Sequence, residues 1–268
     1  MSTPSASIRF LPRYGNIWRI SYPLMLAGIS ETLIDITDTI FLARYGLTEL
    51  AAIGLADAWF MLFLFLSLGL VDGIQIIVSR RAGEKREHEI GRVFNQGLYL
   101  MVIVSVVMTG LILLMLSLGA GDLLASDEVA LATESYLRIA AFSLLFQSVN
   151  LAFGTFFIAI GQTRILIGAA LVLAGSNIAL DYLLIFGKFG LPEMGIEGAA
   201  VASLTAEILA CLFLAGSIIY KGFNRHYGLL RFERWNHSIS RSLISLSCTV
   251  AIDTLVDLMR WFLLFAII

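Results

Sequence analysis

Three acidic residues stand in an apolar stretch that is long enough to cross a membrane. Glu31, Asp35 and Asp38 fall between Pro23 and Arg44, and their spacing places the three carboxyl groups along one stripe of a helix. A carboxylate that faces lipid is costly, so acids at this depth face a protein interior or a water-filled cavity, where they bind protons, ions or substrate. We therefore expect such a site on this stripe. The alternative is that each acid only hydrogen-bonds between packed helices.

A second polar pair follows the same pattern further along the chain. Asn177 and Asp181 are four residues apart in an apolar run, so they share a helix face. Asp181 and Asp38 each fall about one turn before the outer end of their runs, and two helices would then present both carboxyls and the amide to one cavity. An amide suits such a site, because it donates to an ionised carboxyl and accepts from a protonated one. Two unrelated packing acids are the competing interpretation.

Other polar residues in the apolar runs are weaker candidates. Asn150 and Ser203 either line the same cavity or hold helices together, as small polar residues in membrane helices do. Pro23 lacks a backbone N–H and therefore predicts a bend in its helix. For four further residues the sequence leaves open whether they line a pore or are buried and bonded: Asp57, Asp72, Gln75 and Glu207.

The composition of the chain is that of a membrane protein. Of its 268 residues, 59% are hydrophobic and only 14% charged, with a mean hydropathy of +0.88, which indicates a polytopic membrane protein in a lipid bilayer. The net charge of -2 argues against a nucleic-acid partner, because the basic residues cluster in connections. Cys211 and Cys248 fall in apolar runs, so no disulfide framework is implied.

The fold class that follows is all-α, with seven runs that meet the length of a transmembrane helix. Fourteen Lys and Arg residues lie in the N-terminal lead and every second connection, against two in the alternate connections. This asymmetry predicts a cytoplasmic N-terminus in a cell (inner) membrane. The expected spans are 20–42, 50–78, 93–118, 131–160, 165–185, 196–220 and 242–268.

The last run resembles the first. A shift of 222 residues sets Glu31 and Asp35 against Asp253 and Asp257, and both runs point outward, which is a parallel repeat. The domains expected from this are a cytoplasmic lead at 1–16, a six-helix lobe at 17–220, a cytoplasmic connection at 221–241 and the first helix of a second lobe at 242–268. We expect a fragment whose missing partner is the rest of that C-terminal lobe.

Several blocks of the sequence resemble the multidrug and toxic compound extrusion (MATE) family, and Asn177 with Asp181 resembles its branch named after the DNA-damage-inducible F protein. The likeness runs from residue 17 onward. It is carried by Pro23 with Asp38-Thr39, LAAIGLA at 50–56, Ser79-Arg-Arg-Ala-Gly83, Phe94-Asn-Gln-Gly97, Gly161-Gln-Thr-Arg164, and Asn177-Ile-Ala-Leu-Asp181 leading into IFGKFGLPEMGIEGAAVAS.

The resemblance implies a transporter and no enzyme, built from two six-helix lobes around a central cleft. It assigns a proton or sodium site to Asp38, Asn177 and Asp181, with Asn150 beside them and Ser203 where the family usually has threonine. Asp35 is outside the family pattern and would be an accessory acid. No cofactor is implied beyond the coupling ion, H+ or Na+, and the full-length protein is expected to be a monomer.

The leading hypothesis is an antiporter that exports small amphipathic, often cationic, organic compounds in exchange for H+ or Na+. A lipid-carrier flippase of the same superfamily is the first alternative, although it favours a basic cavity. A channel or a membrane scaffold without transport is the second, and neither needs a titratable pair. Reading the gene beyond Ile268 for a second six-span half is the cheapest discriminating observation.

The distribution of basic residues predicts the topology, which labelling of intact cells can test. Cysteines placed near Arg86 and Arg231 should be protected from an impermeant thiol reagent, whereas a cysteine near Lys188 should react. Labelling in the opposite sense would reverse the orientation and move the acids to the other half of the membrane.

Overall fold

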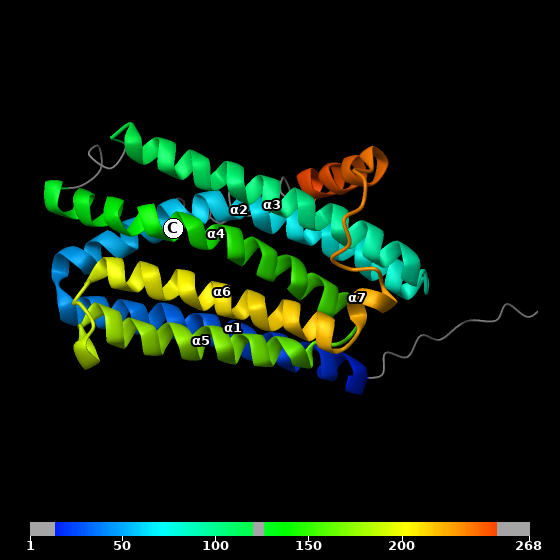
Figure 1. Cartoon of the computed structure of the whole chain (residues 1–268), viewed down its shortest axis with the longest axis horizontal. Helices are drawn as coiled ribbons and strands as arrows, with labels where there is room; N and C mark the ends of the chain where they lie inside the picture. Colours follow the sequence, from blue (N-terminus) through cyan, green and yellow to red (C-terminus); the bar gives the residue numbers. More distant parts are fainter. Residues whose placement is uncertain (1–13, 120–125, 251–268) are drawn as a thin grey trace, which may run out of the picture.

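Six long helices form the bulk of the protein in a computed structural model that describes residues 14–119 and 126–250 (Figure 1). A short 3-10 turn, η2 (Lys188–Gly190), and a short helix, α7 (Phe223–His226), lie in connections, and residues 237–250 are again helical. The long helices are α1 (Tyr14–Tyr45), α2 (Leu47–Gly83), α3 (Glu87–Ser117), α4 (Asp127–Ala159), α5 (Arg164–Ile185) and α6 (Ile196–Tyr220).

The all-α prediction is confirmed, and the six complete helices match the first six expected spans, two of which extend one residue beyond the ends of α3 and α4. Within the described ranges, five helices are long and apolar enough to cross a membrane, namely α2 to α6. Helix α1 is 32 residues long but is not among them, since its three acids lower its mean hydropathy. The seventh span is helical up to residue 250, whereas Asp253 and Asp257 of the proposed repeat lie outside the described residues.

Helix α4 lies at the centre of the bundle, where it packs against α2, α3 and α6, while α1 packs against α5 and α2. We call the end that carries Arg80, Arg81 and Arg86 the basic end. There, Arg80 Nε and Arg81 Nη1 donate to the Glu84 carboxylate at 3.0 and 2.9 Å, and these bonds hold the pKa of Glu84 below its usual value. Arg80, Arg81 and Arg86 thus surround the Glu84 carboxylate at this end.

Two apolar clusters fill the interior, one near each end. Phe94, Phe156 and Ile218 belong to the cluster at the basic end, whereas Leu144 and Ile185 belong to the cluster at the opposite end. Between the two clusters, helices α2, α4, α5 and α6 present polar side chains that bond across helix pairs: Ser67 with Ser148, Asn150 with Glu207, and Asn177 with Ser203. The bundle thus has a polar layer between two apolar cores.

The α5–α6 hairpin is held tightly by its connection. The backbone N–H of Met194 donates to the Leu184 carbonyl at 2.9 Å, and Gly187 and Gly195 adopt positive φ angles of 61° and 54°, where glycine is the preferred residue. A Cβ on Gly198 would lie 2.8 Å from the Leu184 carbonyl carbon, so only glycine lets α6 start this close to α5. This register sets residue 177 opposite residue 203.

Pro23 is buried inside α1, which stays helical on both sides of it. Proline cannot donate to the carbonyl four residues earlier, which here belongs to Arg19. The hydroxyl of Thr163 donates to that carbonyl at 3.4 Å, so the segment before α5 provides the bond that α1 lacks. The bend that we expected at Pro23 stays a prediction.

The connection after α6 is bonded to the side of α3. Three α3 side chains, Asn95, Gln96 and Tyr99, accept from backbone N–H groups of residues 230, 233 and 236 and donate to the carbonyls of residues 228, 231 and 234, at 2.9 to 3.2 Å. Ser240, in the following helix, also donates to Gln96. The Phe94-Asn-Gln-Gly97 block is therefore an anchor for the connection that leads into the next helix.

Two glycines of α3 offer a matched test of this anchor. A Cβ at Gly91 would clash with the backbone oxygen of Tyr227, whereas a Cβ at Gly110 would meet nothing within 4 Å. Gly→Ala inside a helix usually stabilises by about 0.5–1 kcal/mol, but an overpacked contact costs about 1–3 kcal/mol. Gly91→Ala should therefore lower the melting temperature of the purified full-length protein, while Gly110→Ala should leave it equal or higher. Equal melting temperatures for both variants would contradict the close approach.

Candidate functional site

Asp38 and Asp181 meet between α1 and α5. The two carboxyl groups lie within hydrogen-bonding reach of each other, and their side chains are 9% and 0% exposed. No N–H or O–H group of the described residues reaches either oxygen of Asp181 or Oδ1 of Asp38. Two carboxylates in contact away from water repel strongly, so this pair is stable only with a proton or a metal cation between them.

Asn177 stands one turn before Asp181 on the same face of α5. Its Nδ2 donates to the hydroxyl of Ser203 on α6 at 3.2 Å, while its buried Oδ1 has no donor in the described part of the chain. The structure thus brings four predicted site residues into one region: Asp38, Asn177, Asp181 and Ser203.

Tyr136 on α4 belongs to this region, and the sequence analysis missed it. Its side chain is buried, its hydroxyl lies within hydrogen-bonding reach of Ser203, and the carboxylates of Asp38 and Asp181 act on it electrostatically. A signal was present, because Tyr136 precedes Asn150 by fourteen residues, about four helical turns, and therefore shares its face of α4. One hydroxyl in a long apolar run does not distinguish a site residue from a packed tyrosine.

Asn150 contacts Glu207 on α6, which is the helix-to-helix alternative for this residue and not a contact with the residues around Asp38 and Asp181. Its Nδ2 donates to Oε2 of Glu207 at 2.6 Å and to the backbone oxygen of the same residue at 3.0 Å. Glu207 is four residues beyond Ser203 on α6, so this contact lies about one turn nearer to the basic end. The predicted set is therefore divided between two neighbouring levels of the polar layer.

The acidic stripe of α1 is only partly turned inward. Asp38 is buried, whereas Glu31 and Asp35 are exposed on this chain, on a helix that also exposes Ile29 and Ile36. The three carboxyls share one stripe of α1, and only the last of them, Asp38, is buried and meets an acid of α5.

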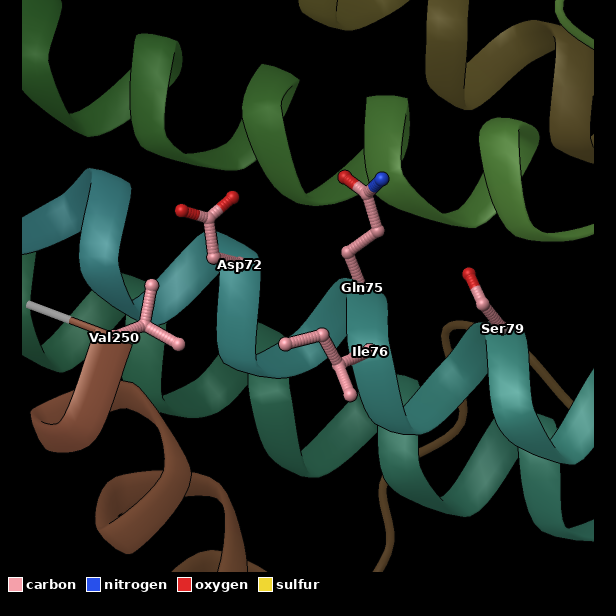
Figure 2. A pocket seen from close by; sticks show the side chains of 5 residues that line it. All are labelled: Asp72, Gln75, Ile76, Ser79 and Val250. Carbon is pink, nitrogen blue, oxygen red and sulfur yellow. The ribbon is translucent and has the colours of Figure 1, made fainter. Parts of the chain in front are cut away.

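A separate cavity of about 400 Å³ lies between α2 and the helix at 237–250. Figure 2 shows Asp72, Gln75 and Ser79 on one side of α2, with Val250 on the neighbouring helix. None of the residues around Asp38 and Asp181 lines this cavity. Asp72 is exposed and Gln75 partly exposed at this cavity, so neither is a fully buried residue, and the pore-lining role of both stays a prediction.

The buried oxygens around Asp38 and Asp181 suit a small cation. Oxygens of Asp38, Asn177 and Asp181 are buried and meet no donor in the part of the chain that the structure describes. Carboxylate and amide oxygens are the ligands that hard cations prefer. No group of three or more His, Cys, Asp and Glu side chains gathers as metal ligands in the described ranges. The arrangement therefore fits a shared proton, or a monovalent cation bound with help from amide and hydroxyl oxygens.

Comparison with known proteins finds one matching family and several curated relatives. The family model described as MatE matches residues 23–183. A curated relative from Rhizobium meliloti, described as "Probable multidrug resistance protein NorM", is 31% identical over 218 residues, which are 80% of this chain and 44% of the relative. "Multidrug resistance protein NorM" from Vibrio cholerae is 25% identical over 242 residues, 89% of this chain and 51% of that relative.

Solved structures agree with the sequence comparison. One of them is described as the outward-facing conformation of a multidrug resistance MATE family transporter of the MOP superfamily. It superposes with a TM-score of 0.81 at 23% identity, and the match covers 92% of this chain and 54% of the solved chain. The MATE-like fold that we predicted is therefore confirmed. The chain spans about half the length of the curated relatives it matches.

The bond between Asn177 and Ser203 allows a test of how the site is held. Ser203→Ala leaves the buried Nδ2 of Asn177 without its acceptor, which should destabilise the purified full-length protein by about 1–3 kcal/mol. Ser203→Thr keeps the hydroxyl and should behave like the wild type. A thermal melt of the three proteins distinguishes these outcomes, and an unchanged melting temperature for Ser203→Ala would show that the bond does not hold the site.

Proposed function

We propose, from the premise that this chain belongs to the MatE family, that it is the N-terminal half of a secondary antiporter that exports amphipathic, cationic organic compounds. The exchanged ion is H+ or Na+. Relatives are named as multidrug resistance proteins and as a transporter, not as enzymes, and multi-pass helices suit this role. In cells, the protein would lie in the inner membrane with its N-terminus and basic end in the cytoplasm.

One observation carries the proposal, namely the set of buried oxygens of Asp38, Asn177 and Asp181 that meet no donor from residues 14–119 and 126–250. A buried acceptor without a donor costs about 1–3 kcal/mol, and more when it is charged. A proton or Na+ between the helices removes this cost, so the site has a strong reason to bind a cation. Intramembrane acids of this kind mark ion and proton pathways.

Antiport requires that the cation and the drug each weaken the binding of the other. The Asp38–Asp181 pair is negative when it has lost its cation, and it then attracts a cationic drug. Loading with H+ or Na+ from outside neutralises the pair and removes that attraction, so the drug leaves. Because the coupling between two ligands is reciprocal, drug binding favours release of the cation by the same factor.

The other half of the transporter would meet the open side of α1 and α2. That side carries Glu31 and Asp35 together with exposed apolar residues such as Ile29 and Ile36. Acids beside apolar side chains are the surface that an amphipathic cation recognises, and they would form one wall of a cleft closed by the second lobe. We assign Asp35 an accessory role in this wall, and the full-length protein is proposed to act as a monomer.

Substitution of the paired acids in the full-length gene product tests the proposal. Asp38→Asn and Asp181→Asn keep the shape and remove the titratable group, so each should reduce drug-driven H+ or Na+ exchange in proteoliposomes to background while leaving expression normal. Because the two acids act as one unit, the double variant should be little worse than either single variant.

A matched control is available on α4. Asp127→Asn makes the same chemical change at an exposed position in the first turn of that helix and should leave exchange unaltered. Drug export by Asp181→Asn with unchanged pH and sodium dependence would show that Asp181 is only a packing residue.

A further inference from the structure

Glu207 and Asn150 form a second polar contact within the bundle, between α6 and α4. Among the described residues, the amide nitrogen of Asn150 bonds to Glu207 alone, at 2.6 Å to Oε2 and 3.0 Å to the backbone oxygen. Those two bonds use both hydrogens that the amide can donate. The remaining atom of the amide, Oδ1, is fully buried and meets no donor from the described residues. Oδ1 of Asn150 is therefore an unused hydrogen-bond acceptor beside a carboxyl group.

The electrostatic surroundings of Glu207 contain no compensating cation. The Glu31 carboxylate on α1 acts on it electrostatically, and the Cys211 thiol lies one turn further along α6. From α4 the group that faces it is the neutral Asn150. Within residues 14–119 and 126–250, no Lys, Arg or His forms an ion pair with Glu207. An ionised Glu207 would thus be stabilised by one amide and repelled by one carboxylate, which makes the charged form costly in the middle of the membrane.

The contact lies in line with the first site. Asp181 and Asn177 are four residues apart on α5, Asn177 bonds to Ser203, and Glu207 is four residues beyond Ser203 on α6. Each step of four residues advances about 6 Å along a helix. The polar side chains therefore continue from the Asp38–Asp181 pair toward the basic end, through the layer that separates the two apolar cores.

We propose that Glu207 and Asn150 form a second proton-binding station, located between the Asp38–Asp181 pair and the basic end of the bundle. Glu207 takes up a proton as the carboxylate and gives it up as the carboxylic acid. When protonated, the acid provides the O–H donor that Oδ1 of Asn150 lacks, and Nδ2 of the amide continues to donate to Oε2. This inference rests on the proposed function, because it supplies a stopping place for a proton that leaves the first site toward the cytoplasm.

Infrared spectroscopy of the full-length protein in lipid tests the station directly, because protonated carboxyl groups absorb separately from carboxylates. The difference spectrum between acidic and alkaline buffer should contain a protonated-carboxyl band that Glu207→Gln removes. Glu197→Gln, the same substitution at an exposed position on α6, should leave that band in place. Glu207→Asp should retain a band at a shifted frequency, which keeps the test valid if the Gln variant fails to fold.

Two outcomes separate this proposal from the proposed function. If Glu207→Gln removes no band, or Glu207→Asp shifts none, the second station is wrong, whereas exchange measured in Asp38→Asn and Asp181→Asn still tests the first site. The second station is supported if Glu207→Gln lacks the protonated-carboxyl band and takes up one proton fewer on acidification in weakly buffered solution. This result holds even if Asp38→Asn and Asp181→Asn continue to transport.

Discussion

Two carboxyl groups in contact between α1 and α5 set the condition on which the rest of the bundle depends. Asp38 and Asp181 would drive their helices apart if both were ionised without a cation, so the affinity of α1 for α5 is tied to the charge state of the pair. The remainder of the fold fixes the two helices at this contact. Glycine at 198 lets α6 start close to α5, and the hydroxyl of Thr163 bonds to α1 where Pro23 leaves a carbonyl free.

The polar layer explains why the acids tolerate their depth. Side chains that bond between helix pairs occupy the middle of the bundle, and an apolar cluster lies between them and each end. Oxygens without donors are thus concentrated where a change of charge has most effect on packing.

Much of this architecture was predictable from the sequence, because helices in a membrane must be long, apolar and internally bonded. The spans, the shared face of Asn177 and Asp181, and the pairing of Asp38 with Asp181 at similar depth all follow from periodicity and length. Tyr136 and the partner of Asn150 did not follow. Both depend on the rotation of α4 relative to α6, which small differences in packing decide and which hydropathy does not encode. The exposure of Asp35 likewise reflects which neighbours α1 has, and not its own pattern.

The bonds between α3 and residues 228–236 fix the connection after α6 in place, although this connection has little regular secondary structure. It also has many charged residues, so it looks like a place that would tolerate a fused reporter or a protease cut. Yet Asn95, Gln96 and Tyr99 bind it at every third residue, as a peptide is bound in a groove. For protein engineering, this loop should be treated as part of the folded core, and an insertion is better placed elsewhere.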